Sequence, residues 1–513
     1  PLCGRNFEYF SEDPYLASQM AAAHIQGVQS KNVGTSIKHF AANNQEYRRL
    51  SCSSEIDERT LREIYLAAFE TAVREGKPDT VMCSYNKING TFASENHWLL
   101  TEILRDEWGF EGYVMSDWGA VNDRVKGLEA GLDLEMPASG GHTDAEIVAA
   151  VKDGTLDEAV LNRAVERILR IIFKFADDRR PGDFDKEKHD RLAEKIAEES
   201  MVLLKNDGLL PLPKAGKKIA FIGKFAQKPR FQGGGSSHIN SCKITGALAA
   251  AGQLPEITSD ITYAQGYDTA EDRTDPALLA EAVKAAEEAD VAVIFAGLPD
   301  AFESEGYDRS HMQMPECQNE LIREILRVQK NTVVVLHNGS PVEMPWAGDV
   351  NAILESYLCG QAVGAAQVRL LFGLSNPCGK LAETIPLKLQ DNPSYLNFPG
   401  DGQTVEYKEG VFVGYRYYDT KEMDVRFPFG HGLSYTTFQY SDMQLSRGQL
   451  SDRDTLTVSL KVKNTGTVAG KEIVQLYVAD RTGAANRPVK ELKNFTKVFL
   501  EPGQEKTVEM TLD

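Results

Sequence analysis

The chain has 513 residues and a formal net charge of −19, and 42% of its residues are hydrophobic and 26% charged. This composition is ordinary for a globular protein, and the length predicts roughly two to four domains. The acidic excess argues against nucleic acid or an anionic membrane surface as a partner, and no apolar run approaches the ~20 residues of a transmembrane helix.

Residues 1–175 alternate short apolar runs with amphipathic helical patterns. The predicted strands are 35–39, 80–85, 113–116 and 132–136, and helical patterns such as 58–75 and 99–107 lie between them. This alternation predicts parallel strands joined by crossover helices. Each strand ends in polar residues, which is typical of a (β/α) barrel of the TIM type with its site at the strand carboxyl ends. The visible units make about half of the usual eight, so we predict a partial barrel.

Two further folded regions are predicted downstream. Residues 176–190 are charged and hold a Pro-Gly turn, which indicates a linker. Residues 191–391 form a second α/β region, with strands at 218–222, 291–296, 332–337 and 352–355 and helices at 276–288, 318–329 and 361–372. This pattern predicts a doubly wound α/β sandwich. Residues 392–435, rich in Gly, Pro and aromatics, are predicted to connect it to an incomplete β-sandwich at 436–513, where apolar and polar residues alternate.

Asp117 directly follows the predicted buried strand 113–116 and precedes Trp118. A carboxylate at the end of a buried strand costs free energy unless it is paired or used. From position alone, three interpretations stay open: a helix cap, a metal ligand or a nucleophile. The sequence contains no His/Cys cluster with ligand spacing, which disfavours the metal, and we predict no metal and no cofactor.

Other polar groups end strands or lie in the loops after them. Lys38 and His39 end a barrel-type strand, where they suit hydroxyl groups or an anion, unless they form only a salt bridge and a core contact. Glu303 and Glu305 lie in a charged loop after the strand 291–296, either as a solvated loop or as a general acid with its neighbours. The glycine-rich stretch 231–237 has neither a dinucleotide nor a phosphate-loop pattern, and we predict a loop that reaches the other domain's site.

The seven cysteines are scattered, and no pair has redox or metal spacing. They are best explained as reduced or buried thiols. The ends of the chain resemble cuts in a longer protein, so the sequence leaves localisation unknown, with only a lean toward a cytoplasmic or periplasmic setting. An oligomer is compatible with the sequence.

Six motifs together resemble the family 3 glycoside hydrolases, the β-glucosidase group. They are GRNFEYFSEDP (4–14), KHFAANNQE (38–46), VMCSYN (81–86), VMSDWGA (114–120), SEGYDR (304–309) and FPFGHGLSY (427–435). The motifs follow the family's order over nearly the whole chain. The resemblance implies a (β/α) barrel, then an α/β sandwich and a fibronectin-III-like β-sandwich. It implies a retaining exo-β-glucosidase acting on carbohydrate, with β-xylosidase or another exo-glycosidase of the family as the alternative.

The resemblance also implies roles for individual residues. Asp117 matches the nucleophile, and Glu305 matches the acid/base, with Glu303 as the fallback. Residues that match sugar-binding positions or subsite walls are Arg5, Lys38, His39, Met82, Tyr85, Trp118 and Ser236. A non-catalytic carbohydrate-binding protein is the alternative of another class, and the presence of both carboxyls argues against it. A nucleotide-dependent α/β enzyme is disfavoured because no phosphate loop is found.

The proposed chemistry sets demands on the two carboxyls. A retaining glycosidase holds them ~5–5.5 Å apart, one ionised for attack and one protonated for donation. We therefore expect Lys38 or Arg5 to favour the ionised form of Asp117, and the surroundings of Glu305 to raise its pKa. We also expect loop 298–312 to cover the barrel mouth. The family's first barrel strands, with an aspartate that binds distal sugar hydroxyls, are absent here, so we predict missing segments.

Overall fold

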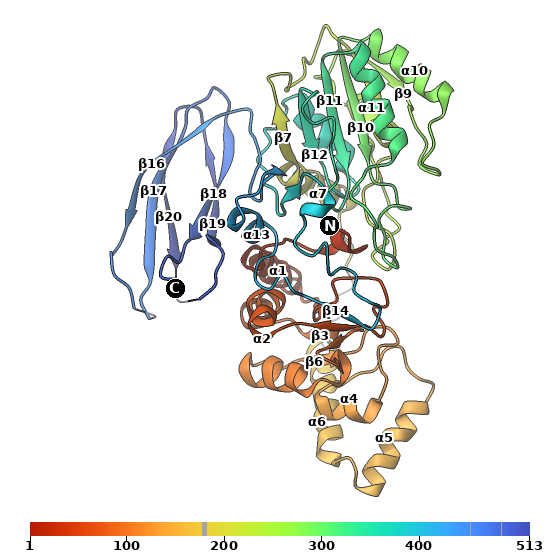
Figure 1. The fold of residues 1–513 in the computed structure, drawn as a ribbon, viewed down its shortest axis with the longest axis vertical. Helices are drawn as coiled ribbons and strands as arrows, with labels where there is room; N and C mark the ends of the chain where they lie inside the picture. The colour runs from red at the N-terminus through yellow and green to blue at the C-terminus, as the bar shows by residue number, and fades with distance from the viewer. Residues whose placement is uncertain (177–181, 452, 484, 513) are drawn as a thin grey trace.

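The computed structural model describes residues 1–176, 182–451, 453–483 and 485–512. Within them, three folded regions follow one another (Figure 1): the first lies at the bottom of the view, the second at the top, and the blue β-sandwich at the left. Of the predicted linker 176–190, residues 177–181 lie outside the described residues. The structure corrects the other end of the predicted linker, because helix α7 (Lys186–Ser200) begins inside it. The helix is capped by Asp185, whose carboxylate accepts a hydrogen bond from Lys188 N at 3.0 Å.

The first region is built on a parallel sheet with strand order β1-β3-β6. These strands are β1 (Ser36–Phe40), β3 (Thr80–Cys83) and β6 (Tyr113–Met115). The α-helices around the sheet are α1 (Pro14–Gln29), α2 (Glu58–Thr60), α3 (Ala67–Thr71), α4 (Arg124–Ala130), α5 (His142–Asp153) and α6 (Glu158–Ala176). Short 3-10 or π-helical segments are η1 (Asn6–Glu8), η2 (Leu61–Tyr65), η3 (Ala72–Gly76), η4 (Ala93–Glu95) and η5 (Trp98–Glu107). The predicted helix 58–75 is therefore a series of α and π turns.

The fourth predicted strand, 132–136, is reduced to one bridge between Met115 and Leu134. The reason lies in Asp133, whose carboxylate accepts a hydrogen bond from Val114 N at 2.8 Å. A side chain thus takes the place of a backbone carbonyl in the ladder. Arg105 and Arg167 pair with the same carboxylate at 2.7 and 3.0 Å, which neutralises the buried charge.

The second region is a mixed sheet with strand order β7-β12-β11-β10-β8-β9. Its strands are β7 (Val202–Asn206), β8 (Lys218–Ile222), β9 (Asp260–Ala264), β10 (Val291–Gly297), β11 (Thr332–His337) and β12 (Ala352–Glu355). Its helices are α7, α8 (Lys224–Gln227), α9 (Ala247–Ala251), α10 (Pro276–Glu287), α11 (Glu316–Val328) and α12 (Val363–Leu371). Every residue of β10 is buried, as expected for a parallel strand covered on both faces. β7 joins antiparallel at one edge.

The connecting segment folds back onto the first region. Its strand β14 (Thr404–Glu406) pairs in parallel with β2 (Ser53–Glu55), in a small sheet with β4 (Lys87–Ile88) and β5 (Thr91–Phe92). The remaining elements between the α/β sheet of the second region and the C-terminal β-sandwich are β13 (Ile385–Pro386), η6 (Leu389–Asp391), α13 (Tyr415–Thr420) and β15 (Val425–Phe427). The connection is thus a structural part of the first domain's wall.

The last region is a β-sandwich of two antiparallel sheets, in the orders β16-β17-β20 and β18-β19. Its strands are β16 (Phe438–Leu445), β17 (Leu456–Asn464), β18 (Gly470–Val478), β19 (Glu491–Leu500) and β20 (Glu505–Leu512). Alternate residues of β17, such as Leu460 and Val462, point into the core. The predicted multidomain fold class is confirmed.

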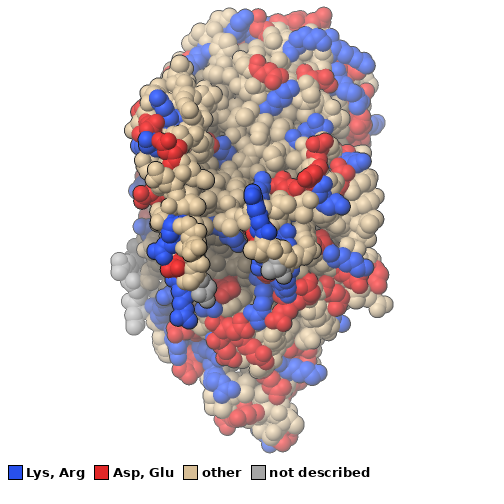
Figure 2. Space-filling model, turned by 60° about the vertical axis from the view of Figure 1, so that its left-hand side comes forward, with Lys and Arg blue, Asp and Glu red and all other residues tan. Residues whose placement is uncertain are grey.

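The surface carries both signs of charge. Figure 2 shows Lys and Arg interspersed with Asp and Glu, with acidic side chains gathered over the lower part of this face, the first region. Among the helices of the described ranges, none is long and apolar enough to cross a lipid bilayer.

Candidate active site

Asp117 lies just beyond the carboxyl end of β6, with only 8% of the residue exposed. Its Oδ1 accepts a hydrogen bond from Trp118 N at 2.7 Å. The next helix, α4, is capped by Asp123, whose carboxylate accepts a hydrogen bond from Lys126 N at 3.0 Å. The capping interpretation of Asp117 is therefore wrong, because another aspartate holds that position.

The second carboxylate oxygen of Asp117 is buried, and within the described residues it accepts no hydrogen bond. His39 Nε2 is 3.3 Å away, close enough for an ion pair but not oriented for a hydrogen bond. Burial, with Arg5 and Lys38 as further causes, lowers the pKa of His39 to about 3, so the ring is neutral at pH 7. Asp117 therefore keeps one oxygen that no hydrogen-bond donor within the described residues uses, which is compatible with a reactive role.

Three of the side chains that the resemblance implied as subsite walls lie on or next to the strands β3 and β6. Tyr85 O–H donates to Trp118 O at 3.0 Å, and burial, followed by the charge of Asp117, raises the pKa of Tyr85 to about 12. Met82 is half-buried on β3 and pairs in register with Met115 on β6. The Trp118 side chain is 61% exposed. Trp118 thus offers exposed aromatic surface next to Asp117, whereas Tyr85 is buried, at 8% exposure.

The second carboxyl comes from the loop between β10 and α11. Arg49 Nη1 lies 3.0 Å from Glu305 Oε1, and Arg5 Nη1 lies 3.4 Å from the same oxygen. Glu305 Oε2 accepts a hydrogen bond from Ser236 N at 2.6 Å. The loop therefore docks against the first domain, as predicted, and Ser236 contributes its backbone N–H.

Glu303, the fallback for the acid/base role, points away from this group. It is fully buried, and Arg230 Nη1 lies 2.6 Å from its Oε2, which also accepts a hydrogen bond from Gly339 N at 2.9 Å. Ser340 Oγ donates to its other oxygen. Both carboxylate oxygens of Glu303 are thus occupied by contacts inside its own domain, and the geometry favours Glu305 for the acid/base role.

The glycine-rich stretch 231–237 packs directly on the Glu305 side chain. Gly235 has φ +95°, and a Cβ at this position would lie 2.3 Å from Glu305 Cβ. A Cβ at Gly233 would lie 2.0 Å from an atom of the Phe7 ring in the first domain. Glycine is therefore required for the stretch to fit between the two domains, which confirms that it reaches the site.

The expected raised pKa of Glu305 is contradicted by the structure. Burial opposes ionisation, but the hydrogen bonds from Ser236 and the cations Arg5 and Arg49 outweigh it and lower the pKa to about 2. The carboxylate is thus ionised at neutral pH in this arrangement. Neither the two guanidiniums nor the hydrogen bonds from Ser236 were predicted from the sequence.

Three contributors were not identified from the sequence: Arg49, Glu46 and Asp308. Arg49 Cζ lies 5.0 Å from the centroid of the Tyr85 ring, and Arg49 also pairs with Glu46 at 2.9 Å. Glu46 and Asp308 lie at or near the ends of the motifs 38–46 and 304–309, so they were visible but had no assigned role. Arg49, one turn beyond Glu46, had no signal of its own beyond this i,i+3 spacing.

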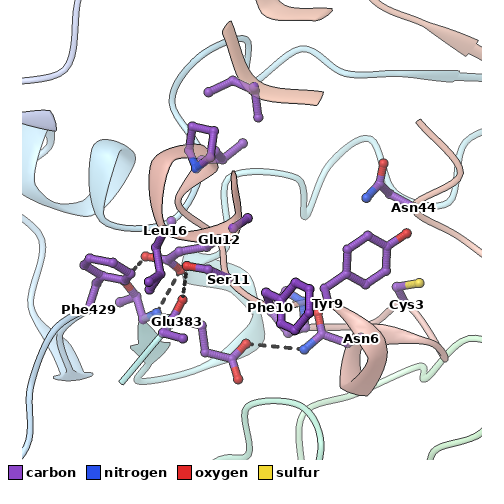
Figure 3. Close-up of a pocket in the computed structure, with 18 of the residues that line it drawn as sticks. Cys3, Asn6, Tyr9, Phe10, Ser11, Glu12, Leu16, Asn44, Glu383 and Phe429 are labelled. Atoms are coloured by element: carbon purple, nitrogen blue, oxygen red, sulfur yellow. Dashed lines mark hydrogen bonds between the residues drawn. The ribbon is translucent and has the colours of Figure 1, made fainter. Parts of the chain in front are cut away.

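Lys38 and His39 also line a cavity of about 800 Å³ between the first region, the second region and the connecting segment. Figure 3 shows part of this wall, with Asn6 Nδ2 donating to Glu383 Oε2 at 3.3 Å. Burial raises the pKa of Glu383 to about 7. Lys38 is exposed on β1, and its charge helps to lower the pKa of its neighbour His39. The lining of the cavity does not include the two candidate carboxyls.

Comparison with known proteins matches three family descriptions in chain order. Residues 1–171 match the glycosyl hydrolase family 3 N terminal domain, residues 201–435 the glycosyl hydrolase family 3 C-terminal domain, and residues 472–513 a fibronectin type III-like domain.

Similar proteins cover the chain over its whole length. Thermostable beta-glucosidase B of Acetivibrio thermocellus is 59% identical over 515 residues, covering 100% of this chain and 68% of that protein. An exo-alpha-(1->6)-L-arabinopyranosidase of Bifidobacterium longum is 49% identical over 528 residues, with 100% and 68% covered. The solved structure of a Bifidobacterium adolescentis GH3 beta-glucosidase has a TM-score of 0.95 at 48% identity, covering 100% of this chain and 75% of that one. Beta-glucosidase 3B from Thermotoga neapolitana, in complex with glucose, has a TM-score of 0.91 at 38% identity, with 100% and 76% covered.

Proposed function

Because this chain belongs to glycosyl hydrolase family 3, we propose that it is a retaining exo-acting β-glucosidase, with Asp117 as nucleophile and Glu305 as acid/base. It releases glucose from the non-reducing ends of β-gluco-oligosaccharides or from aryl β-glucosides. The similarity to the beta-glucosidase of Acetivibrio thermocellus supports this activity. The residue roles rest on the geometry of the site.

One observation carries the proposal: two carboxyls from different domains lie on either side of one short chain of side chains. Arg49 pairs with Glu305 at 3.0 Å and stacks over the ring of Tyr85. The charges of Asp117 and Glu305 both contribute to the raised pKa of Tyr85. Glycoside cleavage needs such a pair, one group to attack the anomeric carbon and one to protonate the leaving oxygen.

In the first step the free oxygen of Asp117 attacks the anomeric carbon, and Glu305 gives its proton to the departing glycosidic oxygen. The bond from the anomeric carbon to the leaving group breaks as the glycosyl–Asp117 ester forms. In the second step water attacks the same carbon while Glu305 takes its proton, which releases glucose and frees Asp117. The exposed ring of Trp118 can stack on the apolar face of the sugar ring.

Glu305 must be protonated for the first step, although Arg5 and Arg49 favour its ionised form. When a sugar binds, its hydroxyl oxygens accept hydrogen bonds from the guanidinium N–H groups, and this removes the conflict. Each cation that turns toward the sugar withdraws charge stabilisation from Glu305 and raises its pKa. Substrate binding thus prepares the acid.

Replacing Arg49 with methionine should shift the pH profile of the free enzyme. Removal of a cation raises the pKa of Glu305 from about 2 toward its ordinary value of 4.5. The rate falls as pH rises through this pKa, because only protonated Glu305 donates. We expect the basic limb of kcat/KM to move to higher pH by about one unit, measured with an aryl β-glucoside.

Arg62→Met is the matched control, because Arg62 forms ion pairs with Glu58 and Glu107 on the outside of the same domain. Its basic limb should coincide with that of the wild type. A shift of the Arg49→Met limb to lower pH would contradict the electrostatic role assigned to Arg49.

The proposed activity is tested by a panel of aryl glycosides on the wild-type protein. The panel holds the β-glucoside, β-xyloside, β-N-acetylglucosaminide and α-L-arabinopyranoside, the last because one relative is an arabinopyranosidase. We expect the highest kcat/KM on the β-glucoside, with β-glucose as the first anomer released in proton NMR. A higher value on the xyloside or the arabinopyranoside would replace the proposed substrate class. Binding without turnover would indicate a carbohydrate-binding protein.

A further inference from the structure

The loop that carries Glu305 is anchored at both ends within its own domain. At one end the buried Glu303 bonds to Arg230, Gly339 N and Ser340. At the other end Arg309, which is 5% exposed, donates to Ser340 Oγ at 3.1 Å and to Pro341 O at 3.0 Å. These contacts fix the base of the loop, whereas its middle, which includes Glu305, lies between the glycine-rich stretch 231–237 of its own domain and the first domain.

Asp308 connects the middle of the loop to two segments of the first domain. Its Oδ1 accepts hydrogen bonds from Gly4 N at 3.1 Å and Glu46 N at 2.9 Å, and its Oδ2 accepts from Tyr47 N at 2.8 Å. A carboxylate that collects three backbone N–H groups is a strong, geometrically defined acceptor. The approach is close, because a Cβ at Gly4 would lie 1.9 Å from Tyr307 O.

Glu46 makes the reciprocal contact. Its Oε2 accepts a hydrogen bond from Gly306 N at 2.7 Å, and the same oxygen lies 2.9 Å from Arg49 Nη1, which pairs with Glu305. Asp308 therefore accepts hydrogen bonds from the backbone N–H groups of Glu46 and Tyr47, and Glu46 accepts one from the backbone N–H of Gly306 in the loop that carries Asp308. The loop residues involved, Gly306 and Asp308, follow Glu305 directly in the chain.

We propose that Asp308 and Glu46 are positioning residues, which form a reciprocal clasp between the two domains and set the place of the Glu305 carboxyl over the barrel mouth. Neither acts on the sugar itself. Both act through Glu305, so the inference rests on the proposed acid/base role of Glu305. A displacement of about 1 Å at a reacting group costs up to about 10²-fold in rate. The step that suffers is protonation of the leaving oxygen.

The test uses aryl β-glucosides whose leaving groups differ in acidity. A 2,4-dinitrophenyl group departs without a proton, whereas a phenyl group needs one. We expect Asp308→Ala and Glu46→Ala to lower kcat/KM about 10²-fold on the phenyl glucoside and at most about 10-fold on the dinitrophenyl glucoside. Asp308→Asn keeps an acceptor oxygen, so it should show the same selectivity with a smaller loss.

Asp272→Ala is the matched control. The Asp272 carboxylate also accepts two backbone hydrogen bonds, from Glu316 N and Cys317 N at 3.0 Å each, but both lie within the second domain. This variant should keep the wild-type dependence on the leaving group even if its melting temperature falls. Thermal unfolding of each variant checks that the protein is folded at the assay temperature. If an alanine variant is unfolded, Asp308→Asn takes its place in the test.

The double variant Glu305→Ala/Asp308→Ala separates the two hypotheses. It should be no more selective among leaving groups than Glu305→Ala alone, because the group being positioned is gone. A loss in Asp308→Ala and Asp308→Asn that is equal on both glucosides would overturn the clasp. A Glu305→Ala variant without leaving-group dependence would instead overturn the proposed acid/base role.

Discussion

Asp117→Ala should lower kcat by about 10⁴-fold or more on every substrate that the wild type hydrolyses. The carboxylate is placed at the carboxyl end of β6, and one of its oxygens is free of hydrogen bonds within the described residues. Without this nucleophile no glycosyl ester forms, and an activated leaving group cannot substitute for it. Steady-state hydrolysis of the dinitrophenyl glucoside is the most sensitive measurement.

Asp123→Ala is the control for Asp117→Ala. Asp123 is nearby in the chain but caps α4, so its loss should cost about 1 kcal/mol of stability and leave kcat unchanged. An Asp117→Ala variant with near wild-type turnover would exclude the proposed mechanism. Near wild-type turnover in both variants would show that the carboxylate at the strand end carries no chemistry.

Glu305→Ala should act on the two steps separately. On glycosides with poor leaving groups we expect kcat/KM to fall by about 10²–10⁴-fold, because protonation of the glycosidic oxygen is lost. On the dinitrophenyl glucoside the first step should survive and the second should become slow, since no base activates water. Added azide needs no base, so it should restore turnover and yield β-glucosyl azide, which NMR identifies.

Glu303→Ala distinguishes the two acids of the loop. Glu303 is buried against Arg230, so its removal leaves that guanidinium only its exposed partner Asp300 and should cost about 3–5 kcal/mol of stability. We expect a lower melting temperature and no azide rescue. If azide instead rescued Glu303→Ala and left Glu305→Ala unchanged, the assignment of the acid/base would have to be exchanged.

Local sequence patterns were sufficient to predict several of the regular elements. The strands β8, β11 and β12 were predicted with the bounds that the structure shows, because each is a short apolar run buried on both faces. The position of Asp117 at a strand end follows from the same signal. Motif order was sufficient to indicate the family, since it needs no knowledge of contacts.

Boundaries and caps were less predictable where a side chain competes with the backbone. The strand at 132–136 is cut short because Asp133 accepts the hydrogen bond of Val114 N. The linker 176–190 was predicted too long because Asp185 caps α7 inside it. In both places an aspartate decides the local structure, and its partner cannot be identified from composition.

The protonation of the site was decided only by the tertiary structure. The pKa of Glu305 depends on a balance between burial, the hydrogen bonds from Ser236 and two guanidiniums, Arg5 and Arg49, which lie 300 and 256 positions away in the chain. A sequence pattern contains the charges but not their distances, and Coulomb energies depend on those distances. The clasp of Glu46 and Asp308 is hidden for the same reason: backbone N–H groups are present at almost every residue, and only the docking of two domains selects the ones that a carboxylate binds.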